Sequence, residues 1–509
     1  MRKPALLLIA IGLLSVPSFG ATYYVSKSSG LDTHTSTQAQ TKATAWQHLP
    51  GMASCSSNCA SYTPVAGDAF ILMGCDVWVP TDLPVEWQWS GASGNPITVT
   101  VDQTWYNTTN CPSAWNRPVF DGQNLTSADT FINICSSVQC SNNTFDNIEM
   151  KRGGGNGLRY INCFEGPCVN LHVKNMYLHA WHVVTDGSCT VDDIWGGTAY
   201  IENTVIDGSD ATGASPPGAT CYGVGDGALP NVLNSVIHDL ANGIVGYSSD
   251  GSPITISGNL IYNVTDSNAG SHPNALEIVN GGATYYVHDN VFHDNVGETF
   301  MFGNTSEIDF IWNNVFYNIL GNSPEAPQVP GQTGMTFTAW NNTIVDTPGQ
   351  NCFHWNSGDG GTFTAVTIKN THCISSGAVA TASWNGRAAT LTTNTLQTSA
   401  AADSNSSPHF DQYASSQTFA YSPVAVTNST IGAGTNLTAN CSGSTAGLCS
   451  DTNYACSLNA SAETVVCPAR EVNSRPASGA WDTGAYEFSG APLNPPPPAA
   501  SLFVEDIQP

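Results

Sequence analysis

The sequence contains few positively charged residues. Its 509 residues include 13 Lys and Arg against 39 Asp and Glu, which gives a formal net charge of −26 at pH 7. Proteins that bind nucleic acid or anionic membranes normally present a clustered basic face, so we expect neither partner. An anionic polysaccharide would also be repelled unless calcium bridged the like charges. Only 10% of the residues are charged, a composition common in secreted proteins that face neutral glycans.

Long hydrophobic runs are missing after the first twenty residues. The opening segment MRKPALLLIAIGLLSVPSFG has two early cations, an apolar stretch and small residues near its end, which is the pattern of an export signal. We therefore predict a signal peptide at residues 1–20 and a secreted protein, extracellular or at the cell surface. No later stretch approaches the roughly 18 to 20 apolar residues of a membrane span, so we expect no membrane insertion.

Helical periodicity is also nearly absent, and a different repeat takes its place. An asparagine followed by mostly apolar residues recurs at intervals of 28, 28, 31, 25, 31, 24, 28 and 28 residues. These asparagines are Asn147, Asn175, Asn203, Asn234, Asn259, Asn290, Asn314, Asn342 and Asn370. A sharp turn between short strands favours asparagine because it tolerates left-handed backbone geometry, and stacked asparagine amides can hydrogen-bond along the stack. The repeat predicts a three-sided coil of short strands.

The sixteen cysteines indicate disulfides rather than a metal site, because the chain is predicted to be exported. Cys135 and Cys163 are 28 residues apart, as are Cys140 and Cys168, so equivalent cysteines should stack in successive coils. Strands of adjacent coils lie about 4.8 Å apart, which a disulfide can span, so pairing between coils and within one coil both stay open. Four cysteines near the end of the sequence contain no Cys-x-x-Cys pair, so two disulfide bridges are favoured over a zinc site. These cysteines are Cys441, Cys449, Cys456 and Cys467.

The repeat and the two ends of the chain resemble the right-handed parallel β-helix repeat proteins, an architecture shared by pectate lyases, polygalacturonases and many secreted bacterial proteins. ATYYVSKSSG (21–30) and AGDAFILMG (66–74) resemble the beginning of such a helix, and RPASGAWDTGAYEF (475–488) resembles the closing segment of its bacterial members. The resemblance implies an all-β fold, a single-stranded right-handed parallel β-helix with N- and C-terminal capping segments.

The ends of such a coil expose an unpaired sheet edge, which capping segments protect. After the signal peptide we expect an N-terminal cap and first coils at 21–120 and the repeats at 121–390. A C-terminal capping segment should follow at 391–490. The segment 491–509 is rich in proline and should form an extended tail or linker. We expect a monomer.

The catalytic segments that the resemblance would supply are mostly missing. Of the motifs of polygalacturonase-like members, only an Asp-Asp, Asp192 with Asp193, is present, and the Arg-x-Pro-x-x-Arg segment of pectate lyases is absent. A lyase needs a base beside a uronate carboxylate, commonly Lys or Arg. Lys151, Arg152 and Arg159 could supply such a base.

Five segments fall at comparable positions between the recurring asparagines and are predicted to form one sheet. They are NGLRY (156–160), NGIVG (242–246), NALEI (274–278), ETFMF (298–302) and NCFHW (351–355). Strand alternation should point one set of side chains inward, namely Leu158, Ile244, Leu276, Phe300 and Phe353. The next residues should point outward, toward the face where this fold commonly binds long glycans: Arg159, Val245, Glu277, Met301 and His354.

Glu277 is the principal candidate for a catalytic group, because it is predicted to be an exposed strand carboxylate. Glu298 begins the next segment, at about 11 Å between Cα atoms, so the carboxyl groups could approach the separation of about 6.5 to 9.5 Å used by inverting glycosidases. His272, on the loop before Glu277, could orient a carboxylate or bind sugar. The alternatives are a solvated glutamate, a turn substitution and a loop-capping histidine.

Further residues are candidates for substrate binding on the same face. They are Asn274, His354, Trp355 and Arg159. His354 could donate a hydrogen bond and Trp355 could stack on a sugar ring, although Trp355 is equally suited to the core. Three functions stay open: a glycoside hydrolase, a polysaccharide lyase with or without calcium, and a surface protein that binds glycans without catalysis. Polysaccharide is the expected partner in each. The sequence implies no cofactor, and calcium is an option for the lyase alone.

Overall fold

The computed structural model describes residues 20–490 with short gaps. The gaps are 136–138, 156–157, 164–167, 183–186, 193–198, 214–220, 249, 266–272, 280–281, 298, 304, 320–324, 327–332, 346–350, 356–361, 407–408, 418, 453–455 and 468–471. The predicted signal peptide and proline-rich tail therefore lie outside the described residues.

Most of the described chain forms three long parallel sheets, which we name A, B and C. Sheet A contains β1 (Thr22–Val25), β2 (Ala69–Gly74), β5 (Ile97–Tyr106), β8 (Cys140–Asp146), β11 (Cys168–Lys174), β14 (Ala199–Glu202), β17 (Asn231–Leu233), β20 (Ile254–Ser257), β23 (Thr284–His288), β26 (Ile308–Trp312), β29 (Met335–Trp340), β32 (Phe363–Lys369) and β36 (Thr390–Thr392). Sheet B contains β4 (Val85–Trp87), β7 (Thr130–Ile134), β10 (Arg159–Asn162), β13 (Gly187–Asp192), β16 (Cys221–Ala228), β19 (Asn242–Tyr247), β22 (Leu276–Val279) and β25 (Phe300–Gly303). Sheet C contains β3 (Val77–Trp78), β6 (Val119–Asp121), β9 (Glu149–Lys151), β12 (Tyr177–His179), β15 (Val205–Asp207), β18 (Val236–Leu240), β21 (Leu260–Val264), β24 (Val291–His293), β27 (Val315–Tyr317), β30 (Thr343–Val345), β33 (His372–Ile374) and β37 (Thr395–Gln397).

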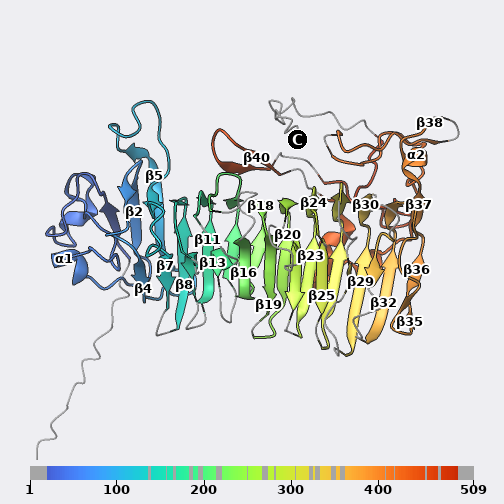
Figure 1. Cartoon of the computed structure of the whole chain (residues 1–509), viewed down its shortest axis with the longest axis horizontal. Helices are drawn as coiled ribbons and strands as arrows, with labels where there is room; N and C mark the ends of the chain where they lie inside the picture. The colour runs from blue at the N-terminus through green and yellow to red at the C-terminus, as the bar shows by residue number, and fades with distance from the viewer. Residues whose placement is uncertain are drawn as a thin grey trace, which may run out of the picture.

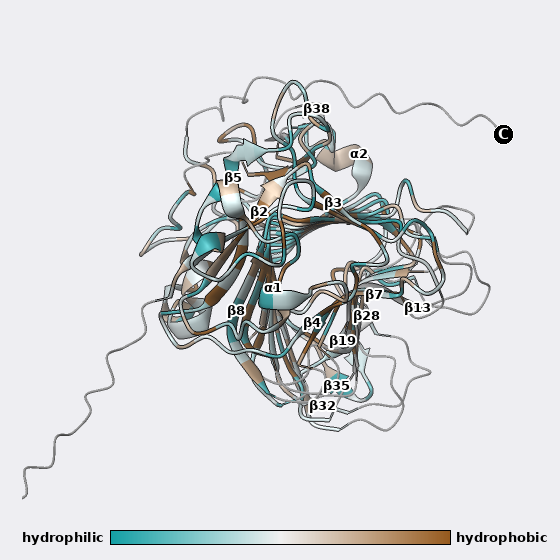
Figure 2. Cartoon of the chain, turned by 90° about the vertical axis from the view of Figure 1, so that its left-hand side faces the viewer, coloured by the Kyte–Doolittle hydropathy of each residue, from teal (hydrophilic) through white to brown (hydrophobic). Residues whose placement is uncertain are grey.

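The three sheets are the walls of a right-handed parallel β-helix, as the sequence predicts. From β4 to β27, each coil contributes one strand to sheet B, then one to sheet A and one to sheet C, and the strands of successive coils pair in parallel. Figure 1 shows the coils stacked along the long axis of the molecule, and Figure 2 views the same walls along that axis. Large apolar side chains fill the interior, which gives a single core cluster along the coil.

The remaining elements are short. Helices α1 (Ser57–Ala60) and α2 (Ser399–Ala402) have four residues each. The 3₁₀ turns are Gln38–Gln40, Lys42–Thr44, Thr438–Asn440 and Gly443–Cys449. Two-stranded sheets pair β28 (Glu325–Ala326) with β31 (His354–Trp355), β34 (Ser383–Trp384) with β35 (Arg387–Ala388), β38 (Asn405–Ser406) with β39 (His409–Phe410), and β40 (Ser457–Asn459) with β41 (Thr464–Val466). In the part of the chain that the structure describes, no helix is long and apolar enough to cross a bilayer.

The recurring asparagines occupy two adjacent columns of the coil. In the first column the residue has a left-handed backbone at the turn between sheets A and C. Its members are Asn147, Asn175, Asn203, Asn234 and Asn370. In the second, one position later, the side chain is fully buried and its amide bonds to an adjacent coil. Its members are Asn259, Asn290, Asn314 and Asn342. Tolerance of left-handed backbone therefore explains the asparagines of the first column, and hydrogen bonding between stacked amides explains those of the second.

The disulfides answer the question that the cysteine spacing left open. Cys135 bonds to Cys140 and Cys163 bonds to Cys168, so each bridge lies within one coil. Cys140 and Cys168 are register partners in sheet A, which confirms that equivalent cysteines stack. Among the four cysteines near the end of the sequence, two bridges form as predicted. They are Cys441–Cys449 and Cys456–Cys467.

The segment 391–490, predicted as a C-terminal cap, also runs back along the side of the coil. After β36 and β37 have added a last rung, the chain turns back over sheet C (Figure 1). Phe419 and Tyr486 pack on sheet C residues such as Val291, and the carbonyl of Ala462 accepts a hydrogen bond from Arg117 at 3.4 Å. The β40–β41 hairpin, which contains Ala462, is thus attached to one of the first coils.

A pair of buried carboxyl groups interrupts the apolar core. Glu307 and Asp309 are 0% and 3% exposed, and Asp309 lies in register between the buried rings of Tyr285 and Phe337. Burial raises the pKa of Asp309 to about 7. Burial, with the charge of Asp309, raises the pKa of Glu307 well above its usual range. Both groups are therefore more easily protonated in the folded chain than in the unfolded chain.

This pair predicts a pH-dependent stability. Because the folded pKa values are raised, the stability is fully present below about pH 4, the ordinary carboxyl pKa, and is lost as pH rises through about 7. We expect Asp309→Asn to be more stable than the wild type at pH 8 by about 2 kcal/mol and nearly equal at pH 4. Thermal unfolding between pH 4 and 8 measures this, with the exposed Asp403→Asn as control. Parallel curves for the wild type and Asp309→Asn would contradict it.

Candidate functional site

The outer face of sheet B around β22 is organised as the sequence predicts. The side chains expected to point inward are fully buried, at 0% exposure. They are Leu158, Ile244, Leu276, Phe300 and Phe353. Val245, Glu277 and Met301 are register partners on successive strands β19, β22 and β25. Glu277 is half-buried on this face. Its position follows from strand alternation, since both neighbours in the sequence, Leu276 and Ile278, belong to the core.

Two buried amides hold the carboxylate of Glu277. Its Oε2 accepts a hydrogen bond from Asn274 Nδ2 at 2.8 Å and a longer one from Asn242 Nδ2 at 3.4 Å. Asn274 is 0% exposed and Asn242 is 3% exposed. Asn274 stands three residues before Glu277, and Asn242 opens strand β19 of the preceding coil. A carboxylate that is only solvated does not need such support, whereas a group that transfers a proton must be held in place.

The prediction that Asn274 contacts substrate directly is not supported by its position. Its side chain is buried beneath Glu277 and donates to it, so Asn274 is a positioning residue. Trp355 is 8% exposed and belongs to the core cluster, which favours the core alternative for this residue. His354 is half-buried on β31, where it pairs with the backbone of Glu325 on β28. It therefore lies on a separate two-stranded sheet, and the prediction that NCFHW (351–355) belongs to the same sheet as Glu277 is wrong.

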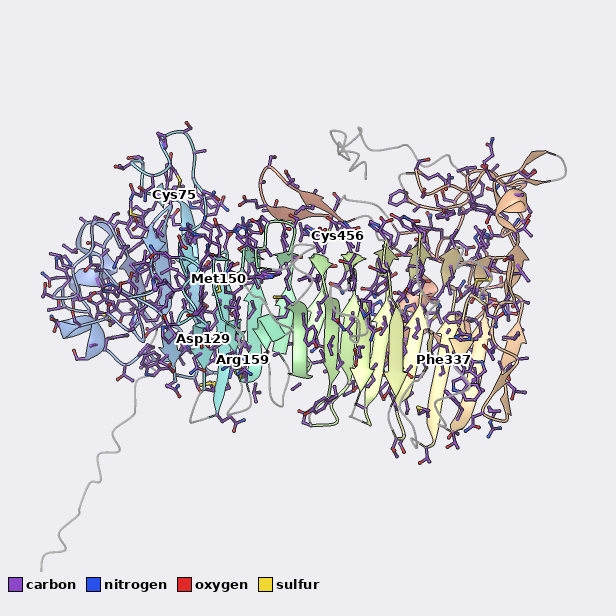
Figure 3. The ribbon with its side chains drawn as sticks, in the orientation of Figure 1. Cys75, Asp129, Met150, Arg159, Phe337 and Cys456 are labelled. Atoms are coloured by element: carbon purple, nitrogen blue, oxygen red, sulfur yellow. A yellow bond between two sulfur atoms is a disulfide. The ribbon has the colours of Figure 1, made fainter. Side chains whose placement is uncertain are left out.

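Arg159 lies on sheet B but outside the column of Glu277, which corrects the prediction. It is half-buried at the start of β10 and pairs in register with Thr130 of β7. The column of Glu277 runs instead through Val245 toward Asn162. Val191 pairs with Ile161 on one side and with Val224 on the other, so Asn162, three residues after Arg159, lies in line with Val245. The irregular pairing of β13 with β16 accounts for only one of these residues. Figure 3 shows Arg159 near Asp129, whose carbonyl accepts a hydrogen bond from the Arg159 backbone.

The other two catalytic candidates, Glu298 and His272, lie outside the described residues. The predicted pair of Glu277 and Glu298 therefore stays a prediction. Backbone pairing of β22 with β25 places the residues after position 298 on the coil next to Glu277.

A second polar cluster, which the sequence patterns did not indicate as a site, lies on the outer face of sheet C. Glu149 is 4% exposed and accepts hydrogen bonds from Lys151 Nζ at 2.5 Å and His179 Nε2 at 3.2 Å. His179 Nδ1 also lies 2.7 Å from Asp210 Oδ2. Burial alone would lower the pKa of His179, but the bonds to Asp210 and Glu149 raise it to about 9. Alternation along sheet C could have shown the cluster, since Lys151 and His179 are register partners.

The cluster on sheet C predicts an alkaline loss of stability. Because the folded pKa of His179 is raised, its contribution is fully present below about pH 6.5 and is lost as pH rises through about 9. Asp210→Asn should lower the free energy of unfolding by about 1 kcal/mol at pH 6. The effect is small because Asp210 is half-exposed, so solvent screens its charge. The same substitution should have little effect at pH 10. Chemical denaturation at the two pH values measures the difference, and an equal loss at both would contradict it.

Apart from cysteines that form disulfides, one group of side chains in the described part of the chain could hold a divalent cation. Asp207, His238 and Asp239 place one ligand atom each within 4.8 Å of one another, and His238 Nδ1 lies 2.5 Å from Asp239 Oδ2. Carboxylate and imidazole groups suit several divalent metals. This cluster is on sheet C, so it does not adjoin Glu277.

Comparison with known proteins gives likenesses of structure only. No protein-family description matches the sequence, and no curated protein matches it. Among solved structures, pectate lyase Pel9A is similar at 15% identity and a TM-score of 0.43, over 92% of this chain and 97% of that one. A rhamnogalacturonan lyase gives 14% and 0.39, over 68% and 88%. A GH136 lacto-N-biosidase from Eubacterium ramulus gives 12% and 0.35, over 74% and 68%. The assignment of the fold rests on the strand pairings themselves.

Proposed function

We propose that this protein is a secreted polysaccharide-active enzyme, a glycoside hydrolase that uses Glu277 on the outer face of sheet B. The observation that carries the proposal is the fixed orientation of Glu277, whose Oε2 accepts hydrogen bonds from two buried amides, Asn274 and Asn242. The regular rise of the coil supports it, because rungs about 4.8 Å apart form a long straight face that suits an extended polymer. The scarcity of cations in the chain favours a neutral glycan.

In this proposal Glu277 and Glu298 share the proton transfers of an inverting hydrolysis. One carboxylate removes a proton from the water that attacks the anomeric carbon, and the other carboxylic acid donates a proton to the leaving glycosidic oxygen. One carbon–oxygen bond forms as another breaks, and the proton passed to the leaving group is recovered from the attacking water. The amides that donate to Oε2 keep the carboxyl group of Glu277 in a fixed orientation during the reaction.

The test is to incubate the purified mature protein with neutral and uronate polysaccharides, with and without calcium. Reducing ends and ultraviolet absorbance are recorded together. A hydrolase releases reducing ends without new absorbance, and this is the expected result. If both signals rise together, the reaction is an elimination, and Arg159, on the same sheet, becomes the candidate base. If a demonstrably folded protein produces neither signal from any glycan, the catalytic proposal fails and a binding function takes its place.

A further inference from the structure

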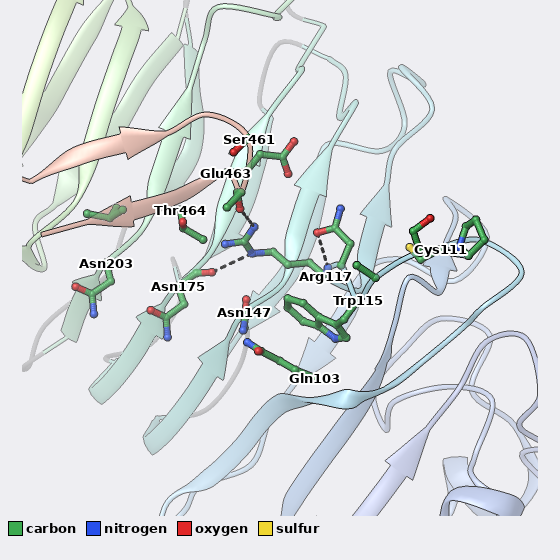
Figure 4. Close-up of a pocket in the computed structure, with 16 residues that line it drawn as sticks. Gln103, Cys111, Trp115, Arg117, Asn147, Asn175, Asn203, Ser461, Glu463 and Thr464 are labelled. Atoms are coloured by element: carbon green, nitrogen blue, oxygen red, sulfur yellow. Dashed lines mark hydrogen bonds between the residues drawn. The ribbon is translucent and has the colours of Figure 1, made fainter. Parts of the chain in front are cut away.

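A cavity of about 810 Å³ lies at the corner of the coil opposite sheet B. Three separate parts of the chain form its walls (Figure 4). The first is the connection from β5 to β6, residues 111–117, which the disulfide Cys75–Cys111 ties down. The second is the turn between sheets A and C. The third is the β40–β41 hairpin, residues 461–465, whose strands are joined by Cys456–Cys467.

Arg117 places a buried positive charge in the wall of this cavity. The residue is 3% exposed, and the hydrogen bonds that its side chain makes to described residues go to two backbone carbonyls. Nε donates to Asn175 O at 3.3 Å and Nη1 donates to Ala462 O at 3.4 Å. Among the described residues no carboxylate lies within ion-pair distance of Arg117, although the charges of Glu463 and Glu149 act on it from farther away. A buried guanidinium without a direct ion pair is costly, and it is suited to bind a carboxylate.

The rest of the lining is rich in amides and hydroxyls. Asn147, Asn175 and Asn203 project from equivalent turns of successive coils, so they repeat at about 4.8 Å. Gln103 and the indole of Trp115 complete the wall beside Arg117 (Figure 4). Amides can both donate to and accept from the hydroxyl groups of a ligand. A small inorganic anion would use the guanidinium but not the row of amides, whereas a chain of sugar rings would use both.

We propose that this cavity binds a carboxylated sugar unit within an oligosaccharide, with the carboxylate on Arg117 and the hydroxyls along the three asparagines. The site is separate from the face of Glu277 and does not depend on the proposed hydrolysis. The net charge of −26 does not prevent this binding, because salt screens distant charges beyond about 8 Å, while Arg117 acts at hydrogen-bond range.

Glu463, on the hairpin, gives the proposed site a pH dependence. It is half-buried in the lining. Burial raises its pKa, and Glu149 raises it further, while His179, Arg117 and Lys151 oppose the rise. A bound carboxylate would add another negative charge beside it. Binding should therefore favour the protonated form of Glu463 and be tighter at pH 5 than at pH 8.

The experiment is calorimetric titration of the full mature chain with a β-1,4-linked glucuronic acid trisaccharide. Cellotriose is the matched neutral probe, since it differs in lacking the carboxylates, and sodium acetate is the simple anion. We expect the acidic trisaccharide to bind at least about ten-fold more tightly than cellotriose at pH 5. Arg117→Gln should lose at least about ten-fold of that affinity. Glu463→Gln should keep it and show little difference between pH 5 and 8.

The same titration in Glu277→Gln separates this site from the face of sheet B, because the cavity should bind there unchanged. Equal affinity for the two trisaccharides overturns the proposal, as does full binding by Arg117→Gln. Acetate that binds as tightly as the acidic trisaccharide would mean an adventitious ion only. If Arg117→Gln does not fold, the comparison of the two trisaccharides and the pH dependence in Glu463→Gln still decide the result.

Discussion

Replacing Glu277 by glutamine is expected to lower kcat on the polysaccharide that the wild type cleaves by about 100-fold or more. General acid or base catalysis by a positioned group contributes about 10²- to 10⁴-fold, and glutamine can neither accept nor release the proton. The fold should be retained, because glutamine keeps an oxygen that can accept from Asn274 and Asn242. Initial rates of reducing-end release, with thermal unfolding to confirm the fold, measure the effect.

A matched control lies on the same sheet. Glu86 on β4 is an exposed carboxylate that accepts from Asn133 Nδ2 at 2.9 Å. It is six strands away from β22 in sheet B, or about 29 Å at the rung spacing. Glu86→Gln should leave kcat unchanged. If Glu277→Gln retains the wild-type rate, or if both variants lose it equally, Glu277 is an ordinary strand residue.

Removal of one amide from the buried asparagine column should cause the largest loss of stability. Asn314 Nδ2 donates to Asn342 Oδ1 at 3.0 Å and to Val287 O at 2.9 Å, and its Oδ1 accepts from the backbone and side chain of Asn290 at 3.0 Å. Asn314→Ala removes the side-chain acceptor of the Asn290 backbone N–H and the side-chain donor to Val287 O, and it opens a small void. We expect a loss of about 3–5 kcal/mol in the free energy of unfolding, measured by chemical denaturation.

The control for this prediction is an asparagine of the turn column. Asn203 is exposed and has a left-handed backbone, with φ 50°. Asn203→Ala should cost only the backbone preference, about 1 kcal/mol, and Asn203→Gly should cost less. Equal losses for Asn314→Ala and Asn203→Ala would show that the buried column is not a separate source of stability.

The coil is predicted well because the alternation of side chains along each strand and the repeat of asparagines are both local and periodic. The inward set on sheet B, including Ile244 and Leu276, follows from alternation within each strand. The asparagine repeat identifies the coil but merges two columns, since Asn234 and Asn259 differ by one position within a coil of variable length. A shift of one residue is invisible in intervals that already vary from 24 to 31 residues.

The features that the sequence does not predict depend on distant contacts. Arg117 and Ala462 are 345 residues apart in the sequence, so no local pattern predicts that they are hydrogen-bonded. Asn162, and not Arg159, lies in the column of Glu277, because the number of residues between the recurring asparagine and the sheet B strand differs from coil to coil, which periodic reasoning treats as constant. Asn274 was assigned to substrate from its place near Glu277, but whether a loop amide faces solvent or a neighbouring carboxylate is decided by packing.

The most direct test of the catalytic face is a crystal structure of Glu277→Gln with an oligosaccharide of the polymer that the wild type cleaves. The inactive variant should retain the ligand uncut. The account predicts a sugar chain that lies across β19, β22 and β25, with the scissile bond beside residue 277. A chain bound elsewhere, with the face of sheet B empty, would contradict it.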